Sequence, residues 1–261
     1  MNQTILLEIN NSIATLSFNR PQAMNSYNLE LAQAFAEATE TVKNDPTIRA
    51  VLLRGNGAMF MAGGDIQFFS QHLDEMADQV SVMMPYVKQT VLNLQTMSKP
   101  VLASVHGSVA GIGMSFMAAC DLVIAADTTK FTLAYGALGI SPDGGASYFL
   151  PRLVGTKKAM QLALFSELFD AQTAQEMGLI NWVVPEAELN TQTEKYAQKL
   201  AKGASLAFAE MKQLINQTGD NSLSEQLELE EKSFTKCAQS DDFKEGVRAF
   251  LAKRKAEFKG L

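Results

Sequence analysis

The sequence has few of the residues that hold metals or form disulfides. It contains two cysteines and two histidines in 261 residues. Cys120 and Cys237 are far apart, and Cys120 lies in an apolar run that is typical of a buried thiol. This pattern fits neither a disulfide framework nor a zinc site. His72 and His106 are not part of an H-E-x-x-H motif, so we expect no metal.

Basic residues and long apolar runs are also scarce. The 22 Lys and Arg residues are outnumbered by 28 Asp and Glu residues, which gives a net charge of −6. Nucleic acid is therefore not the expected partner, because phosphate backbones bind basic surfaces. No segment reaches the roughly 18 apolar residues of a membrane helix, and the first residues lack the basic region of a signal peptide. We expect a cytoplasmic protein with no membrane partner. Its 47% hydrophobic content supports one large core.

The chain does have glycine-rich corners between apolar segments. Residues 101–105 form an apolar run, which is followed by Gly107, Gly111 and Gly113 and then by the small and apolar residues 114–120. This pattern predicts a buried strand, a glycine turn and the start of a helix. The first amides of a helix have no partner inside it and can bind negative oxygen.

A second corner has the same order of features. The apolar residues 50–53 precede a turn, and residues 59–65 then lead into a helix-like stretch. If the two corners face each other, the amides near Gly64 and Ile112 would form a pair of donors for a carbonyl oxygen that becomes an oxyanion. A tight connection is the simpler interpretation of either corner alone. A dinucleotide fingerprint is excluded because Phe116 stands where the third glycine is needed.

The remaining pattern alternates strands and helices and then becomes helical. Residues 5–9 and 13–18 predict an opening hairpin. Ser26 is the expected N-cap of the first helix, and Asp170 is the expected cap of a short later one. Many buried strands with helices between them predict an α/β core. The helical last third has more apolar positions than one layer needs, so we expect a subunit interface there.

Several segments along nearly the whole chain resemble the crotonase, or enoyl-CoA hydratase/isomerase, superfamily. The resemblance rests on Asn19-Arg20-Pro21 with Asn25, residues 60–65, 100–121, 142–145, 242–246 and 250–254. It implies a spiral core of ββα units over residues 1–195 and a helical trimerisation region over residues 196–261. It also implies an acyl-CoA thioester as the partner, a homotrimer or a dimer of trimers, and no cofactor, since coenzyme A is part of the substrate.

The resemblance also implies positions for the site. In the family two backbone amides hold the thioester oxygen, and the motifs place them at Gly64 and Ile112. Basic residues meet the phosphates of coenzyme A, and the candidates here are Arg20 and Lys253 or Arg254. The expected substrate pocket comprises Ala62, Asp65, Phe68, Met84, Ser115 and Tyr135, with Phe69 as a further candidate. Asp65 is interpreted as a helix cap, because it follows Gly64 at a predicted helix start.

The sequence departs from the hydratase pattern at the two catalytic glutamates. Ser115 and Tyr135 occupy these positions, and neither is a base at pH 7 without an activator. Asp143 matches the aspartate of family isomerases, including those that act on β,γ-enoyl and ring-epoxide phenylacetyl thioesters. Pro142-Asp143-Gly144 is also a turn signature by itself. The resemblance makes Asp143 the expected catalytic residue.

The leading hypothesis is therefore an enoyl-CoA isomerase that stabilises a thioester enolate and moves a proton with Asp143. Three alternatives stay open at this point. A hydratase would add water, and a hydrolase or dehalogenase would use Asp143 as a nucleophile. A non-catalytic acyl-CoA-binding protein would keep the fold and turn over nothing. The acyl group and the pathway do not follow from the sequence.

Overall fold

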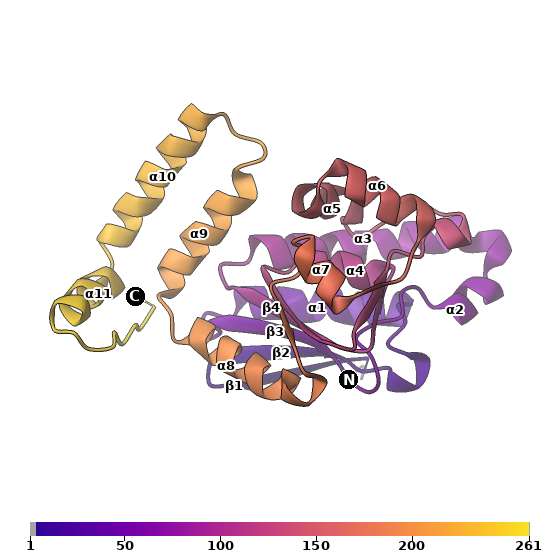
Figure 1. The fold of residues 1–261 in the computed structure, drawn as a ribbon, viewed down its shortest axis with the longest axis horizontal. Helices are drawn as coiled ribbons and strands as arrows, with labels where there is room; N and C mark the ends of the chain where they lie inside the picture. Colours follow the sequence, from indigo (N-terminus) through magenta and orange to yellow (C-terminus); the bar gives the residue numbers. More distant parts are fainter. Residues whose placement is uncertain (1–3, 261) are drawn as a thin grey trace.

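The computed structural model describes residues 4–260 (Figure 1). Within this part of the chain the strands form a six-stranded and a three-stranded sheet. The larger sheet contains, in spatial order, β1 (Ile5–Asn10), β2 (Ile13–Phe18), β3 (Ala50–Gly55), β4 (Val101–Val105), β6 (Leu122–Ala126) and β9 (Trp182–Val184). The smaller sheet contains β5 (Ser108–Ala110), β7 (Lys130–Thr132) and β8 (Phe169–Asp170). The predicted opening hairpin is confirmed, because β1 and β2 are antiparallel, and the other neighbouring strands of the large sheet (β2, β3, β4, β6 and β9) run parallel.

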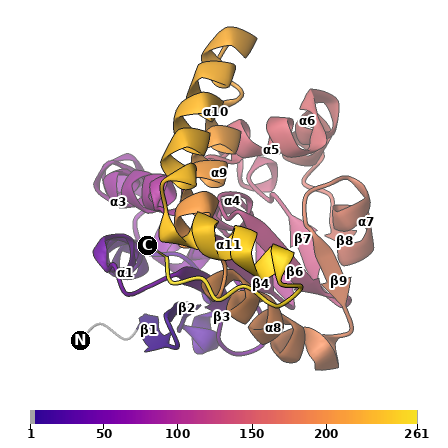
Figure 2. The ribbon, with the colours of Figure 1, turned by 90° about the vertical axis from the view of Figure 1, so that its left-hand side faces the viewer.

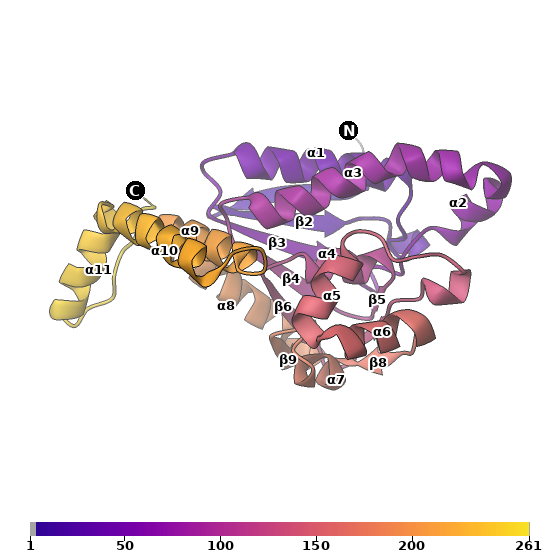
Figure 3. The same ribbon diagram turned by 90° about the horizontal axis from the view of Figure 1, so that it is seen from above.

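Both faces of the large sheet are covered by helices, as expected for parallel strands. The helices α1 (Leu29–Asn44) and α3 (Met76–Thr96) pack against each other on one side. The helix α8 (Leu189–Ala201) packs against β2, β3, β4 and β6. Figure 2 shows α8 below the sheet and α3 above it, and Figure 3 shows α1 and α3 side by side. Successive strand residues alternate between the faces, so Val51 and Leu53 join the main core while Leu52 joins the cluster under α8.

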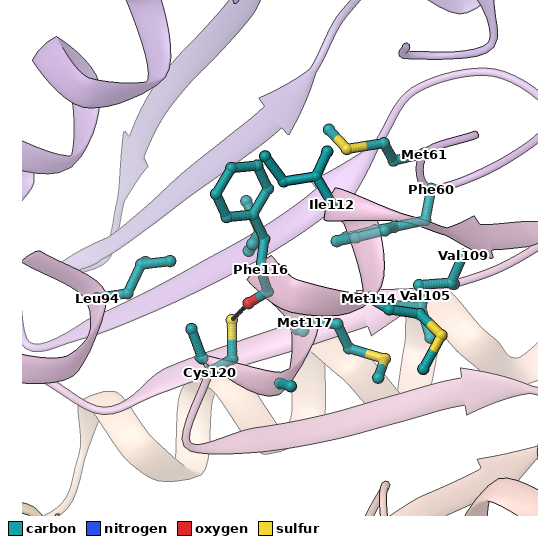
Figure 4. Close-up of a cluster of buried hydrophobic side chains, with 14 of the residues drawn as sticks. Phe60, Met61, Leu94, Val105, Val109, Ile112, Met114, Phe116, Met117 and Cys120 are labelled. Atoms are coloured by element: carbon teal, nitrogen blue, oxygen red, sulfur yellow. Dashed lines mark hydrogen bonds between the residues drawn. The ribbon is translucent and has the colours of Figure 1, made fainter. Parts of the chain in front are cut away.

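The predicted strand, glycine turn and helix of the central stretch are also present. They are β4, β5 and the short helix α4 (Ile112–Ala118), every residue of which is buried. Figure 4 shows apolar side chains from several elements packed around α4. Phe116 packs against the aromatic rings of Phe35 and Tyr27, each at a centroid distance of 5.2 Å. The buried thiol of Cys120 donates to the carbonyl oxygen of Phe116. This packing fixes α4, and with it the corner at Gly111.

The last helices lie beside the core and extend away from it (Figure 1). They are α9 (Ser205–Gln217), α10 (Leu223–Ala238) and α11 (Asp241–Leu251). The boundary expected after residue 195, between the spiral core and the helical region, lies within α8. The helices that extend away from the core begin with α9. Buried Lys212 joins α9 to the core, because its Nζ donates to Asp121 Oδ2 at 2.8 Å and to the carbonyl oxygens of Leu94 and Lys99.

The remaining helices are short, and one of them, α7 (Ala171–Glu176), packs against β7, β8 and β9. The others are α2 (Ile66–Gln71), α5 (Ala146–Val154) and α6 (Thr156–Phe165), with one-turn 3-10 helices at Pro21–Ala23, Leu73–Glu75, Gly136–Leu138 and Glu186–Glu188. The cap at Asp170 is confirmed, since its side chain accepts from the amide of Thr173. The cap at Ser26 is wrong. Asn28 caps α1 instead, and its Oδ1 accepts a hydrogen bond from the Leu31 amide at 3.0 Å. Ser26 lies before the helix, where its side chain contacts the guanidinium of Arg20. No helix among the described residues is long and apolar enough to span a membrane.

Candidate active site

The largest described cavity lies between α2, α3 and the two glycine corners. It has a volume of about 980 Å³. One wall, from α2 to α3, is almost entirely apolar and includes Ile66, Phe69, Leu73, Met76, Val80, Met83, Met84 and Val87. The opposite wall contains Gly64, Ile112 and the segment from Leu133 to Asp143. A cavity with an apolar wall and a few polar groups on the other side is typical of a site for a ligand with an apolar portion.

The two glycine corners lie side by side, which is the arrangement that the predicted pair of amide donors requires. Met61 and Val109 pair as parallel strands do, and the amide of Ala110 donates to the carbonyl oxygen of Met61 at 2.9 Å. Gly63 and Gly111 both have positive φ. A Cβ atom at Gly63 would lie 3.3 Å from the carbonyl oxygen of Ala110, which is tighter than most real Cβ contacts, so glycine eases the close approach of the two segments.

The amides of Gly64 and Ile112 are both available at this junction. Ile112 is the first residue of α4, where a helix amide has no partner within the helix. Gly64 lies between two residues that bond to Tyr27: the carbonyl oxygen of Gly63 accepts from the Tyr27 amide, and the Asp65 amide donates to the Tyr27 carbonyl. Among the hydrogen bonds of residues 4–260, neither the Gly64 nor the Ile112 amide donates to a protein acceptor.

Asp143 is the one acidic residue among the described residues that line the cavity. Its carboxylate accepts a hydrogen bond from the hydroxyl of Tyr135, with 2.5 Å between Oη and Oδ1. The buried Ser115 hydroxyl lies 3.1 Å from the same Oη and donates to the Asp143 carbonyl oxygen at 2.9 Å. Ser115 and Tyr135, which the resemblance predicts at the positions of the hydratase glutamates, therefore both form hydrogen bonds that hold Asp143 in place.

The protonation of this group follows from burial and hydrogen bonding. Burial raises the pKa of Asp143, and the hydrogen bond from Tyr135 opposes this because it stabilises the charged carboxylate. Burial also raises the pKa of Tyr135, and the negative charge of Asp143 raises it further. Tyr135 thus stays a neutral donor, and Asp143 is a stronger base than an exposed aspartate when it is ionised.

The backbone after Asp143 is as constrained as its side chain. Gly144 and Gly145 have φ of +57° and +86°. A Cβ atom at Gly144 would lie 2.8 Å from the Cβ of Ser115 and 3.2 Å from a side-chain carbon of Ile112. The turn signature predicted for this segment is therefore real, and it places the backbone of Asp143 and Gly144 against α4.

The expected pocket residues divide into two groups. Ala62, Met84 and Tyr135 line the cavity, whereas Asp65, Phe68 and Ser115 do not. Ser115 is fully buried behind Asp143.

Two of the residues that do not line the cavity belong to α2 and its N-cap. Asp65 caps the helix, as interpreted, by accepting from the amides of Gln67 and Phe68 at 3.1 and 3.2 Å. Phe68 packs against the ring of His72 with 4.5 Å between the ring centroids, and its neighbour Phe69 lines the cavity instead.

The candidate basic residues do not line this cavity. Arg20 forms an ion pair with Asp65 at 2.9 Å and also donates to the carbonyl oxygen of Ser26. Its guanidinium therefore links the segment before α1 to the corner that ends at Asp65. Arg254 pairs with Glu245 through two hydrogen bonds. Lys253 and Arg254 follow α11, at the opposite end of the molecule from α2 (Figure 1). Their contact with the phosphates of coenzyme A stays a prediction.

Tyr27 is a cavity residue that the sequence analysis missed. Its ring is 2% exposed and its hydroxyl has no hydrogen-bond partner. In the sequence alone, nothing distinguishes Tyr27 from an aromatic residue of the core. Within residues 4–260 there is no group of three His, Cys, Asp or Glu side chains placed to hold a metal ion.

Fold and sequence together define the family. Residues 8–261 match the family model of enoyl-CoA hydratase/isomerase, and the chain belongs to this family. The expected α/β fold with crotonase-like architecture is thereby confirmed.

Relatives within the family have different activities. The chain is 36% identical to 1,2-epoxyphenylacetyl-CoA isomerase of Escherichia coli, with 100% of both chains covered. It is 32% identical to trans-2-decenoyl-[acyl-carrier-protein] isomerase of Streptococcus mutans, with 98% of both covered. The crystal structure of an enoyl-CoA hydratase from Polaromonas sp. JS666 superposes with a TM-score of 0.93 at 32% identity, covering 98% of this chain and 99% of that one.

Proposed function

We propose that this protein is an acyl-CoA isomerase that shifts a carbon–carbon double bond next to the thioester. The observation that carries the proposal is a cavity that is lined by a single acidic residue, Asp143, and by Gly64 and Ile112, whose amides are unpaired. A double-bond shift needs one group that removes a proton and returns it elsewhere. Water addition by the family's usual route needs two carboxylates, and Ser115 and Tyr135 stand in their place.

The reaction begins when the ionised Asp143 takes a proton from the α carbon of a β,γ-unsaturated thioester. The electron pair of the C–H bond moves into the conjugated system, and negative charge accumulates on the thioester oxygen. The amides of Gly64 and Ile112 donate to this oxygen. Protonated Asp143 then returns the proton to the γ carbon, which leaves the double bond between the α and β carbons and restores the carboxylate.

The expected contribution of the amides is large because they are fixed by the fold. A well-aimed donor to an oxyanion is worth about 3 kcal/mol, so two donors lower the barrier by an amount that corresponds to several powers of ten in rate. The raised pKa of Asp143 serves the same reaction, because a group that both removes and returns a proton works best with a pKa closer to the working pH.

Asp143→Asn tests the proposal, because the amide keeps the shape of the side chain and removes the base. We expect the conjugation of a 3-enoyl-CoA, followed by ultraviolet absorbance, to fall by about 10²- to 10⁴-fold. Binding of a saturated acyl-CoA should be retained. Full activity in Asp143→Asn would refute the assigned base, and equal binding without turnover in the native protein would favour a non-catalytic acyl-CoA-binding protein.

We also propose that the C-terminal helices form the contact between subunits. Their exposed apolar side chains include Met211, Ile215, Leu223, Leu227, Phe234, Phe243, Val247, Phe250 and Leu251. Large apolar surfaces of this kind are rare on monomers. Light scattering should give the mass of a trimer or a hexamer, and a monomer at micromolar concentration would contradict this assignment.

A further inference from the structure

The amide of Gly64 is held in a different way from the amide of Ile112. Ile112 begins α4, and the carbonyl oxygen of the same peptide group, at Gly111, accepts from the Met114 amide at 3.0 Å. Gly64 lies outside the helices and named strands, two residues before α2. The direction of its N–H must therefore be fixed by contacts with another segment of the chain.

The segment before α1 makes this contact through the peptide group that contains the Gly64 amide. The carbonyl oxygen of Gly63 accepts from the Tyr27 amide at 2.7 Å. The peptide bonds of residues 4–260 are all trans, so the N–H of each peptide group points away from its C=O. The hydrogen bond from Tyr27 to Gly63 therefore aims the N–H of Gly64 in the opposite direction, away from the Tyr27 amide.

The same relation holds one peptide group further back, where Arg20 is the donor. The Tyr27 amide shares its peptide group with the carbonyl of Ser26, and Nη1 of Arg20 donates to that carbonyl oxygen. The Arg20 guanidinium, the Ser26–Tyr27 peptide group and the Gly63–Gly64 peptide group thus form a series of hydrogen bonds, which we name the peptide relay. Its last donor is the Gly64 N–H, which has no acceptor among the described residues.

The peptide relay acts on the Gly64 N–H in two ways. It restrains the rotation of both peptide groups, and it polarises the last donor, because each hydrogen bond in a chain strengthens the next. The positive charge of Arg20 lies at the end opposite to the free N–H, so the peptide dipoles are aligned to favour negative charge beyond Gly64. A donor that is fixed before the reaction stabilises an oxyanion without further reorganisation.

The other contacts of Arg20 keep its guanidinium in this position. Nη2 forms the ion pair with Asp65, in which only 15% of the Arg20 side chain and 12% of the Asp65 side chain are exposed. The backbone amide of Arg20 donates to Asn25 Oδ1 at 2.9 Å. The planar fork of arginine lets one side chain bond both the carboxylate and the Ser26 oxygen, whereas lysine has a single ammonium group.

We propose that Arg20 is a positioning residue for the reaction: through the peptide relay it aims and polarises the Gly64 amide that stabilises the thioester oxyanion. This inference rests on the proposed function, in which the Gly64 amide binds that oxygen. It gives Arg20 a different role from the phosphate contact that the family resemblance implies. An ion pair that served stability alone would need the contact with Asp65 and not the bond to Ser26.

Two variants separate the peptide relay from the ion pair. Arg20→Lys keeps a positive charge beside Asp65 and loses the fork that also reaches Ser26. Asp65→Asn removes the ion pair and leaves the bond from Arg20 to Ser26, and asparagine still caps α2. We expect kcat for a 3-enoyl-CoA to fall by about ten- to a hundredfold in Arg20→Lys and by less than about threefold in Asp65→Asn, since the loss of a whole oxyanion donor costs about 10²- to 10³-fold. The dissociation constant of a saturated acyl-CoA should change little in either variant.

Infrared difference spectroscopy measures the strength of the amide donors without turnover. The ligand is a saturated acyl-CoA with ¹³C at the thioester carbonyl, and the native protein should lower its carbonyl stretching frequency relative to the free thioester. Arg20→Lys should lose about half of this shift, because one of the two donors is no longer aimed, and Asp65→Asn should keep it. The native shift and kcat in Arg20→Lys would overturn the inference. So would equal losses in the two variants, because the ion pair would then be responsible.

A 3-enoyl-pantetheine, which has no nucleotide phosphates, tests the alternative role of Arg20. The peptide relay predicts the same fold loss of kcat/KM in Arg20→Lys for the pantetheine and the CoA thioester. A loss confined to the CoA thioester would place Arg20 at the phosphates and overturn the inference.

Asp143→Asn, measured in parallel, separates this inference from the proposed function. If Asp143→Asn retains turnover while Arg20→Lys loses the carbonyl shift, the assigned base is wrong and the role of Arg20 stands. The absence of a carbonyl shift in the native protein would overturn the assignment of the oxyanion donors, on which both proposals rest.

Discussion

Tyr135→Phe is the substitution that most specifically tests how Asp143 is tuned. It removes the hydroxyl that donates to Asp143 Oδ1 at 2.5 Å and leaves the ring, which is only 6% exposed, in place. Ser115 can still donate to the Asp143 carbonyl oxygen. The variant therefore changes the electrostatics of the carboxylate with little change in shape.

The direction of the effect follows from the role of the bond. Asp143 accepts a proton only when it is ionised, so activity falls as the pH falls through its pKa. The Tyr135 hydrogen bond stabilises the ionised form and lowers the pKa that burial has raised. Without the bond the acid limb of the pH profile moves to higher pH.

The magnitude can be estimated from the hydrogen bond. A hydrogen bond to a charged group contributes about 1.5–3 kcal/mol, which moves the acid limb of kcat/KM upward by about one to two pH units. The assay is the rate of conjugation of a 3-enoyl-CoA across the pH range, since kcat/KM reports groups of the free enzyme. Ser115→Ala is the matched control and should move the limb less, because Ser115 donates to the backbone carbonyl of Asp143. An acid limb at the same pH in the native protein and in Tyr135→Phe would refute the reasoning.

Further predictions concern the scaffold. Lys212→Met leaves the partly buried Asp121 with the Val101 amide but without its cationic partner, so we expect a loss of about 3 kcal/mol in the free energy of unfolding measured with urea, and a smaller loss when Asp121→Asn is added. A double variant as unstable as the single one would contradict this account. Gly144→Ala should lose about 2–4 kcal/mol, because φ is positive and the new Cβ meets Ser115. Gly139→Ala, also at positive φ but with open space around it, should lose only about 1 kcal/mol, and equal losses at the two glycines would disprove the steric argument.

The sequence predicted what depends on local pattern. The glycine corners, the opening hairpin and the cap at Asp170 follow from the spacing of glycine, apolar and capping residues, and the structure has them all. The family resemblance, confirmed by the match over residues 8–261, supplied the order in which these elements are arranged. Local pattern could not distinguish Ser26 from Asn28 as the cap of α1, because both are good capping residues three or fewer positions before the helix.

The direction of side chains could not be predicted in the same way. Phe68 and Phe69 are adjacent aromatic residues of one short helix, and only the tertiary packing of α2 decides that Phe69 faces the cavity. Arg20 was expected at the phosphates of coenzyme A, and in the fold its guanidinium pairs with Asp65, 45 positions away in the sequence. The unpaired hydroxyl of Tyr27 is a property of its three-dimensional surroundings alone.

The central claim is that the site moves a proton and adds no water. Its most direct test is incubation of a 3-enoyl-CoA with the native protein in ¹⁸O-labelled water, with the products analysed by mass spectrometry and ultraviolet absorbance. The account predicts a conjugated 2-enoyl-CoA of unchanged mass and without label. A labelled hydroxyacyl-CoA would identify a hydratase and a labelled free acid a hydrolase, and either as the main product would contradict the account.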